Sequence, residues 1–272
     1  DDTSLKCWGD NTNGKLGLGD TNARGDGPNE MGSRLPSVDL GAGKTAVAVS
    51  VGDDHSCAIL NDTTVKCWGT NHDAYGQLGT GYNDGKSRGD NPDEMGAMLP
   101  TVNLGTDRTV LAVSLGRYYS CAILDRGTVK CWGSNFYGQL GLGDKAHRGI
   151  DANDMGDNLP AVSLGENRTA VKLSAGKSHA CALLDDSSLK CWGKNDMGQL
   201  GQGDAIQRGD GPDEMGEFLP AVNLGSGRIA VEVSAGTDHT CVILDNGDVK
   251  CWGLNTKGQL GQGDTIQRGD GP

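Results

Sequence analysis

Short apolar stretches recur along the chain at intervals of about 60 residues, and each alternates between apolar and polar positions. In the stretch 230–234, Val231 and Val233 lie on either side of Glu232, and the earlier repeats carry apolar pairs at the same places. Alternation with a period of two predicts a β-strand with one buried face. A second and a third strand are predicted around a tight turn between Cys241 and Cys251.

A fourth strand is expected in the segment with the pattern Leu-Pro-x-Val-x-Leu-Gly, for example at 219–225. The proline lacks a backbone N–H group, so this strand is predicted to lie at a sheet edge. A long, glycine-rich and acidic loop at 201–217 separates it from the third strand. Each repeat therefore predicts one four-stranded antiparallel sheet, and the fold class is all-β.

The four letters KCWG mark the third strand of every repeat. Their cysteines are spaced by 60, 64, 60 and 60 residues, at Cys7, Cys67, Cys131, Cys191 and Cys251. One repeat of this kind cannot bury its apolar surface alone, so neighbouring repeats must stack. The 45 glycines of the 272 residues agree with a chain rich in turns and poor in long helices.

The whole chain, 1–272, is interpreted as one repeat array. It divides into a partial unit, three repeats and a second partial unit, at 1–40, 41–104, 105–164, 165–224 and 225–272. We expect either that the chain is a window from a longer array, or that neighbouring chains complete the broken unit at each end. Both interpretations leave unpaired edges at the two ends.

Eight of the nine cysteines fall in pairs ten residues apart: Cys57 with Cys67, Cys121 with Cys131, Cys181 with Cys191, and Cys241 with Cys251. Counting outward from a three-residue turn places Cys121 directly opposite Cys131 in a pair without backbone hydrogen bonds. Cα atoms in such pairs approach to about 4.5 Å, which suits a disulfide. We therefore predict four disulfides, each contributing roughly 2–3 kcal/mol.

Zinc ligation is the alternative use of repeated cysteines. Structural zinc sites favour gaps of two to four residues and four converging ligands, whereas a hairpin separates the members of each pair here. Cys7 has no partner, since its counterpart would precede residue 1. Persistent disulfides predict a secreted or cell-surface protein. Two glycosylation sequons, at Asn61 and Asn167, agree with that location and lie in predicted turns.

The repeats resemble the regulator of chromosome condensation repeat family. The strings GTDHTCVILDNGDVKCWGLNTKGQLGQGD and GKSHACALLDDSSLKCWGKNDMGQLGQGD carry its Gly-x-x-His, Trp-Gly-x-Asn and Gly-Gln-Leu-Gly elements. The resemblance covers essentially the whole chain. It implies a β-propeller with four-stranded blades, seven in a complete ring, of which this chain would supply a little over four.

Two features depart from the intracellular members of that family. Every complete hairpin carries paired cysteines, and inserts such as 208–220 lengthen the loop before the fourth strand. Guanine-nucleotide exchange, which the founding member performs, remains a weak alternative, because fold does not carry function. The net charge of −12 opposes binding to nucleic acid, and no apolar run is long enough to enter a membrane.

The remaining polar motifs repeat in phase with the blades, which favours structural roles. His55, His179 and His239 are interpreted as buried rings that donate hydrogen bonds to the backbone, with Tyr119 replacing them in one repeat. The Arg-Gly-Asp triplets, for example at 208–210, are expected to pair with an acidic loop of the next blade. Integrin-like recognition is the alternative. Acidic loops could hold calcium but lack its usual ligand spacing, so a solvated rim is preferred and no cofactor is expected.

No catalytic motif breaks the symmetry of the array, so no enzyme activity is predicted. The largest departure is a four-residue insertion around Asp73-Ala74-Tyr75 and Asn83-Asp84-Gly85, where a binding specificity could reside. The preferred function is a structural or assembly module of a cell-surface layer or filament, with copies of itself or adjoining repeats as partners. The alternative is a secreted recognition propeller that binds a protein or a glycan. Near-identical loops would favour assembly, since a specific binder needs loops that differ between blades.

Overall fold

The computed structural model describes residues 4–71, 75–82 and 84–271. Within them the regular structure consists of four three-stranded antiparallel sheets and seven short 3-10 turns. The strands are β1 (Ala46–Val51), β2 (His55–Leu60), β3 (Val65–Gly69), β4 (Val110–Leu115), β5 (Tyr119–Leu124), β6 (Val129–Gly133), β7 (Ala170–Ala175), β8 (His179–Leu184), β9 (Leu189–Gly193), β10 (Ala230–Ala235), β11 (His239–Leu244) and β12 (Val249–Gly253). The 3-10 turns are η1 (Thr12–Gly14), η2 (Gly32–Arg34), η3 (Gly96–Met98), η4 (Asp125–Gly127), η5 (Ala152–Asp154), η6 (Gly156–Asn158) and η7 (Gly216–Phe218).

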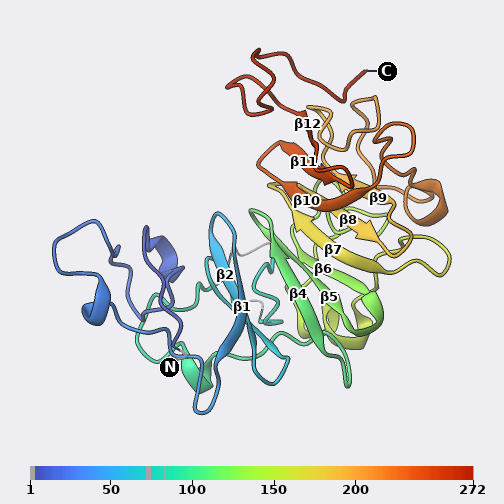
Figure 1. The fold of residues 1–272 in the computed structure, drawn as a ribbon. Helices are drawn as coiled ribbons and strands as arrows, with labels where there is room; N and C mark the ends of the chain where they lie inside the picture. Colours follow the sequence, from blue (N-terminus) through green and yellow to red (C-terminus); the bar gives the residue numbers. More distant parts are fainter. Residues whose placement is uncertain (1–3, 72–74, 83, 272) are drawn as a thin grey trace.

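The sheets follow one another along an arc, with the N- and C-termini at its two ends (Figure 1). In each sheet the strands keep chain order, and the first strands are neighbours in space: β1 lies against β4, β4 against β7, and β7 against β10. The apolar cores form between sheets. Trp132, for example, packs against Ile59 and Val65 of the preceding repeat. This arrangement is the stacking that the repeat predicts.

The sheets contain three strands each, whereas the sequence predicts four. The expected fourth segment, 219–225, makes one backbone hydrogen bond to β9, from Val222 N–H to the Leu189 carbonyl at 2.8 Å. Its alternating apolar residues, including Leu219 and Leu224, are buried in the cores between sheets. Pro220 cannot donate a hydrogen bond. The alternation of apolar and polar residues in this segment therefore reflects which side chains are buried. The segment does not form the ladder of backbone hydrogen bonds that would make it a fourth strand.

A buried lysine fastens this segment in each complete repeat. The Nζ atom of Lys190 donates to the carbonyls of Leu164, at 3.0 Å, and Gly216, at 2.7 Å. Lys130 and Lys66 make the equivalent pairs of bonds. Burial lowers the pKa of Lys130, while the two carbonyl acceptors satisfy its ammonium group. The lysine of the KCWG motif is therefore a structural residue.

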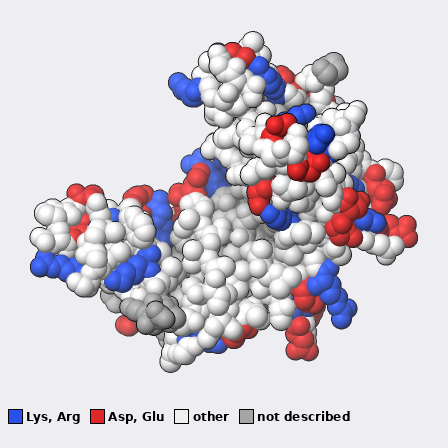
Figure 2. All heavy atoms as spheres, in the orientation of Figure 1, with Lys and Arg blue, Asp and Glu red and all other residues white. Residues whose placement is uncertain are grey.

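Each first strand contains a β-bulge. The pairing of β4 with β5 shifts between Val110 and Ala112, leaving Leu111 as the extra residue. Leu111, Val47, Val171 and Val231 occupy this position in the four repeats and are all exposed. In Figure 2 the Lys, Arg, Asp and Glu side chains gather mainly on projecting loops, and a broad uncharged area covers β1 and β4.

The hairpins have the register that counting from the turn predicts. Cys121 lies opposite Cys131, and Ile123 opposite Val129. The third turn residue has a positive φ at Thr63, Ser187 and Gly247, as expected for a turn followed by a bulge. The turn of η4 differs, because Arg126 also has a positive φ.

Four disulfides cross these hairpins, in the pairs Cys57–Cys67, Cys121–Cys131, Cys181–Cys191 and Cys241–Cys251. The Cα atoms of Cys121 and Cys131 are 4.1 Å apart, slightly less than the distance predicted. Both residues are fully buried. Among the described residues Cys7 is the free cysteine, and burial raises the pKa of its thiol.

Removing one of these disulfides should measurably destabilise the protein. We expect the Cys121→Ala, Cys131→Ala double variant to lose about 2–3 kcal/mol of unfolding free energy, because its unfolded chain is no longer cross-linked. Urea denaturation measures the difference. Cys7→Ala is the matched control, with an expected change below about 0.5 kcal/mol. Equal unfolding midpoints for the double variant and the wild type would contradict this assignment.

Candidate functional site

The repeats differ from one another mainly in two sets of loops. Between the first and second strands they read Gly-Asp-Asp-His, Gly-Arg-Tyr-Tyr, Gly-Lys-Ser-His and Gly-Thr-Asp-His, starting at residues 52, 116, 176 and 236. After the third strand, the loops at 70–77, 134–139, 194–199 and 254–259 differ in composition, and the first is longer. Their framework residues, represented by Asn135 and Gln139, are constant. Loop positions that differ between repeats are the ones at which a specific binding site can form.

The structure places both sets of loops at the same end of the sheets. Ser134 N–H donates to the Tyr118 carbonyl at 2.8 Å, and Lys194 N–H donates to the Ser178 carbonyl at 2.9 Å. The first set also meets across repeats, since Arg117 N–H donates to the Lys177 carbonyl at 3.2 Å. We call the surface formed by residues 53–54, 117–118, 177–178 and 237–238, together with the described residues of the four loops after the third strands, the variable face. Asp73 and Ala74 of the insertion, and Asn83, lie outside the described residues.

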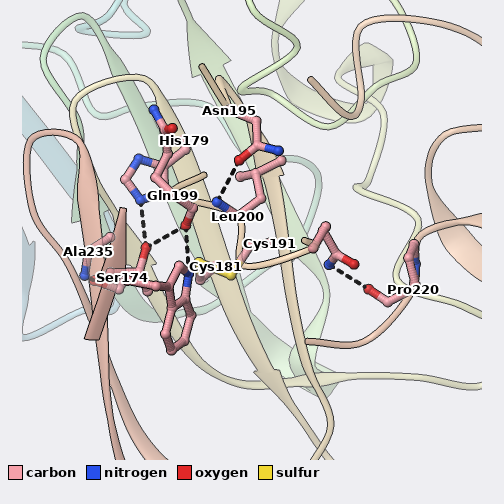
Figure 3. The surroundings of a disulfide bond; sticks show 12 residues. Ser174, His179, Cys181, Cys191, Asn195, Gln199, Leu200, Pro220 and Ala235 are labelled. Carbon is pink, nitrogen blue, oxygen red and sulfur yellow. Dashed lines mark hydrogen bonds between the residues drawn. A yellow bond between two sulfur atoms is a disulfide. The ribbon is translucent and has the colours of Figure 1, made fainter. Parts of the chain in front are cut away.

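A polar framework holds the three variable-face loops at 134–139, 194–199 and 254–259. Asn135 is buried; its Oδ1 accepts from Leu140 N–H at 3.0 Å, and its amide donates to the Asp144 carbonyl at 2.7 Å. Gln139 Oε1 accepts from Tyr137 N–H at 2.9 Å. Figure 3 shows the equivalent Asn195 and Leu200 close to the Cys181–Cys191 disulfide. In these three loops the backbone that carries the variable side chains is therefore tied by side-chain hydrogen bonds.

Four aromatic rings meet on the variable face; we call them the aromatic cluster. Tyr75 is at its centre, with ring centroids 5.4 Å from Tyr118, 5.5 Å from Phe136 and 5.4 Å from His147. Phe136 and His147 are 4.6 Å apart, with nearly perpendicular rings. Edge-to-face packing of this kind stabilises aromatic groups relative to one another. Two neighbouring repeats supply the rings: Tyr75 comes from repeat 41–104 and the other three from repeat 105–164. Neither repeat could form the cluster alone.

His147 is held in the cluster as a neutral ring. Its Nδ1 atom accepts a hydrogen bond from Asn135 N–H at 2.9 Å, so any proton it carries is on Nε2. Burial and, to a smaller extent, the Arg148 guanidinium lower the pKa of His147. An uncharged imidazole is compatible with the apolar rings of Tyr75 and Phe136.

Three cations border the aromatic cluster. The Arg117 guanidinium lies 4.8 Å from the Tyr118 ring centroid, and Lys194 Nζ lies 5.6 Å from that of Tyr137. Both distances are in the range of cation–π attraction. Lys177 is the third. Together with Ser134, Ser178 and Gln139, these residues line a pocket of about 340 Å³ whose apolar wall is Tyr75, Tyr118, Phe136 and Tyr137.

Carboxylates engage two of the three cations. Lys194 pairs with Asp196 at 3.0 Å and lies 3.7 Å from Asp238. Burial would lower the pKa of Lys194, but these carboxylates outweigh it and the pKa is raised. Arg117 Nε is 3.6 Å from Asp54, which is too long for a hydrogen bond. Among the described residues, no carboxylate lies within 4 Å of Lys177 Nζ.

Two of the three repeated histidines, His55 and His179, are fully buried as predicted. His239 was predicted to be buried as well but is half-buried, because it lies in the last sheet of the arc. His179 is fully buried, and its Nε2 is 2.9 Å from the Thr240 hydroxyl of the next repeat, which donates to the Gln199 carbonyl. Figure 3 shows His179 and Gln199 in this network. His55 has the same relation to Ser120. The predicted partner, a backbone group, is therefore wrong: the ring bonds to a hydroxyl that in turn bonds to the backbone.

The Arg-Gly-Asp triplets pair differently from the prediction. The Arg208 guanidinium contacts Asp204 of its own loop at 2.7 Å, not the next blade. A separation of four residues within one turn brings the two together. The aspartate makes the contact between repeats, since Lys145 lies 2.9 Å from Asp210. The arginine is thus held in its loop, and integrin-like recognition remains an untested alternative.

The acidic loops bind their own backbone. Glu214 Oε2 accepts hydrogen bonds from the N–H groups of residues 209, 210 and 211 at 2.9–3.0 Å. The described part of the chain contains no group of three His, Cys, Asp or Glu residues placed to hold a metal ion. Asn61 and Asn167 are exposed in turns, so glycosylation there stays a prediction. No helix among the described residues has the length and hydropathy needed to cross a membrane.

Tyr75 lies in the insertion where a binding specificity was predicted, whereas the other residues of the site were not predicted. Arg117, Lys177 and Phe136 escaped notice because each lies in a loop that looked like a copy of its neighbours. Aligning the four repeats reveals them, since each differs from its equivalents in every other repeat. The premise of near-identical loops therefore does not hold on the variable face.

Comparisons with known proteins agree with this architecture. Models of the regulator of chromosome condensation (RCC1) repeat match residues 46–77, 110–139, 170–199 and 230–259, and a second model of that repeat matches 7–59, 126–183 and 189–243. The ultraviolet-B receptor UVR8 of Arabidopsis thaliana is 29% identical over 97% of this chain. The match covers 52% of UVR8, so the chain spans about half the length of that relative.

Two solved structures are similar in fold. Human WBSCR16 has a TM-score of 0.65 and 21% identity, over 97% of this chain and 65% of that one. Yeast RCC1 (Prp20), solved bound to Kap60, has a TM-score of 0.64 and 19% identity, over 89% of this chain and 51% of that one. The matched repeats cover more than half of the sequence and coincide with the four sheets. The chain belongs to the regulator of chromosome condensation (RCC1) repeat family.

Proposed function

We propose that this chain is a non-catalytic recognition module that binds another protein through the variable face. The observation that carries the proposal is the aromatic cluster, which two neighbouring repeats assemble from loops that differ between repeats. Phe136 is 51% exposed although it packs in the cluster. Exposed aromatic rings beside arginine are typical of the residues that dominate protein interfaces.

The structural relatives support a protein ligand. Yeast RCC1, which shares the fold, was solved bound to another protein, Kap60. That binding belongs to yeast RCC1, and at 19% identity only the fold is shared. The four disulfides favour a compartment in which thiols are oxidised, so we propose that recognition takes place outside the cell.

The two phenylalanines of the chain provide a matched test. Both are exposed, but Phe136 lies on the variable face and Phe218 in η7, within the long loop. We expect quantitative affinity capture with immobilised protein to retain at least one specific partner on wild type and on Phe218→Ala. Phe136→Ala should retain less than about a tenth as much, because a central aromatic anchor is lost. Equal capture by both variants would refute the proposal.

Assembly remains a second candidate, because the two ends of the arc expose complementary apolar positions. Val49 and Val51 are exposed at one end, whereas Leu115, the equivalent of Val51, packs against the preceding repeat. Ile243 and Val249 are exposed at the other end, whereas their equivalents are buried.

Sedimentation analysis separates the candidates: concentration-dependent polymers that Val51→Asp abolishes would favour assembly. Acceleration of nucleotide release from a small GTPase would favour the founding family's exchange activity instead.

A further inference from the structure

We propose that the pocket beside the aromatic cluster binds a peptide segment of the partner in which a single carboxylate side chain is next to an apolar or aromatic one. This inference rests on the proposed function and specifies the chemistry of its ligand. It follows from three properties of the pocket: its unpaired cation, its occupied ring faces and the carboxylates around it.

The first property is a cation with no acidic partner. Lys177 lines the pocket, and no carboxylate of the described residues lies within 4 Å of its Nζ atom. Asp53 and Asp54 already flank the Arg117 guanidinium, so Lys177 is the cation available to a ligand. A carboxylate that accepts a charge-assisted hydrogen bond from Lys177 would therefore be favoured.

The second property excludes a cationic ligand. Aromatic cages that bind ammonium groups need open ring faces. Here Arg117 already lies over the Tyr118 ring and Lys194 over the Tyr137 ring. Tyr75 is surrounded by other rings at about 5.5 Å. The protein therefore supplies its own cations to these rings and presents positive charge to the ligand.

The third property restricts the number of negative charges. Asp53 and Asp54 lie within 4 Å of Arg117, while Asp196 and Asp238 lie within 4 Å of Lys194. A densely charged polymer such as a sulfated glycan would meet these carboxylates and the net charge of −12. A ligand with one carboxylate bound to Lys177 does not bring further negative charges close to these four aspartates. The exposed ring of Phe136 then offers an apolar contact for the neighbouring side chain.

The test uses a random twelve-residue peptide library displayed on phage and panned against the wild-type chain. We expect enriched peptides to share one Asp or Glu beside an apolar or aromatic residue. A synthetic peptide of that consensus should bind about tenfold more weakly to Lys177→Ala, because a charged hydrogen bond is lost. Phe136→Ala should weaken it similarly, while Lys177→Arg should retain most of the affinity. Lys86→Ala is the matched control, since it removes the same charge from an exposed loop position outside the variable face.

The other results separate this inference from the proposed function. Neutral or basic consensus peptides that still require Phe136 would overturn the carboxylate and leave recognition by the variable face standing. Binding of a heparin fragment or of polygalacturonate that requires Lys177, with no peptide enriched, would overturn the peptide ligand and assign an acidic glycan. Peptides whose binding depends on neither Phe136 nor Lys177 would overturn both.

Discussion

Replacing Trp132 by alanine is expected to lower the free energy of unfolding by about 3–5 kcal/mol, the range for truncating a buried aromatic side chain. Trp132 is fully buried between two repeats, and its Nε1 donates to the Gln77 carbonyl at 3.0 Å. A Cβ atom on Gly79 would lie 2.7 Å from that nitrogen, so the backbone at Gly79 packs against the indole ring at a distance that only glycine allows. The variant therefore loses apolar contacts on both sides and one of the two hydrogen bonds to the Gln77 carbonyl, which then keeps only the Ser120 hydroxyl as a donor.

The first repeat provides the control for this prediction. Trp8 is the same residue at the same repeat position, but it is 62% exposed. We expect Trp8→Ala to cost less than about 1 kcal/mol, as usual for surface substitutions. Chemical denaturation of the two variants and the wild type makes the comparison. Similar losses for Trp8→Ala and Trp132→Ala would show that burial between repeats is not the source of stability.

The hairpins could be predicted from the sequence because they depend on short-range rules. The turn length fixes which residues face one another, so the opposition of Cys121 and Cys131 followed from counting. Burial of apolar surface between repeats followed from the repeat itself, because one repeat cannot bury that surface alone. In both cases the local sequence pattern and the tertiary packing favour the same structure, so the structure can be predicted from the repeat.

The fourth strand and the variable face could not be predicted in the same way. Alternation of Leu219, Val222 and Leu224 reports which side chains are buried, and a strand is only one way to bury them. The meeting of Tyr75 with Phe136 depends on how far neighbouring sheets are rotated, which no single repeat encodes. Contacts between loops of different repeats join residues that are far apart in the sequence, so local patterns do not predict them. Aligning the repeats identifies the residues but not their proximity.

Mild acid is expected to destabilise the protein through its buried histidines. Burial lowers the pKa of His55 to about 4 and that of His179 to about 3. The Thr240 hydroxyl donates to Gln199, so it can only accept from His179, whose Nδ1 then has no partner among the described residues. A proton added at Nδ1 would place a charge in the core with no acceptor.

The sign follows from proton uptake by the two states. Below its ordinary pKa of about 6.5 a histidine binds a proton in the unfolded chain, while His55 and His179 stay neutral in the folded one. Stability is therefore complete above pH 6.5 and decreases as the pH falls toward the folded pKa values. Each pKa unit corresponds to about 1.4 kcal/mol, so each histidine costs roughly 3 kcal/mol at pH 4. Asp10, Asp62 and Asp264 have pKa values of about 2, and their stabilising contributions are lost mainly below this window.

Urea denaturation at several pH values between 7 and 4 measures this effect. The wild type should lose stability steadily across the range. His179→Gln can still donate to Thr240 but cannot titrate, so it should lose about half as much, and the His55→Gln, His179→Gln double variant should lose little. Tyr119 occupies the same position in one repeat, which indicates that the site accepts a side chain that does not titrate in this range. A wild-type unfolding free energy that stays constant from pH 6.5 to pH 4 would refute the assignment of these rings as buried and neutral.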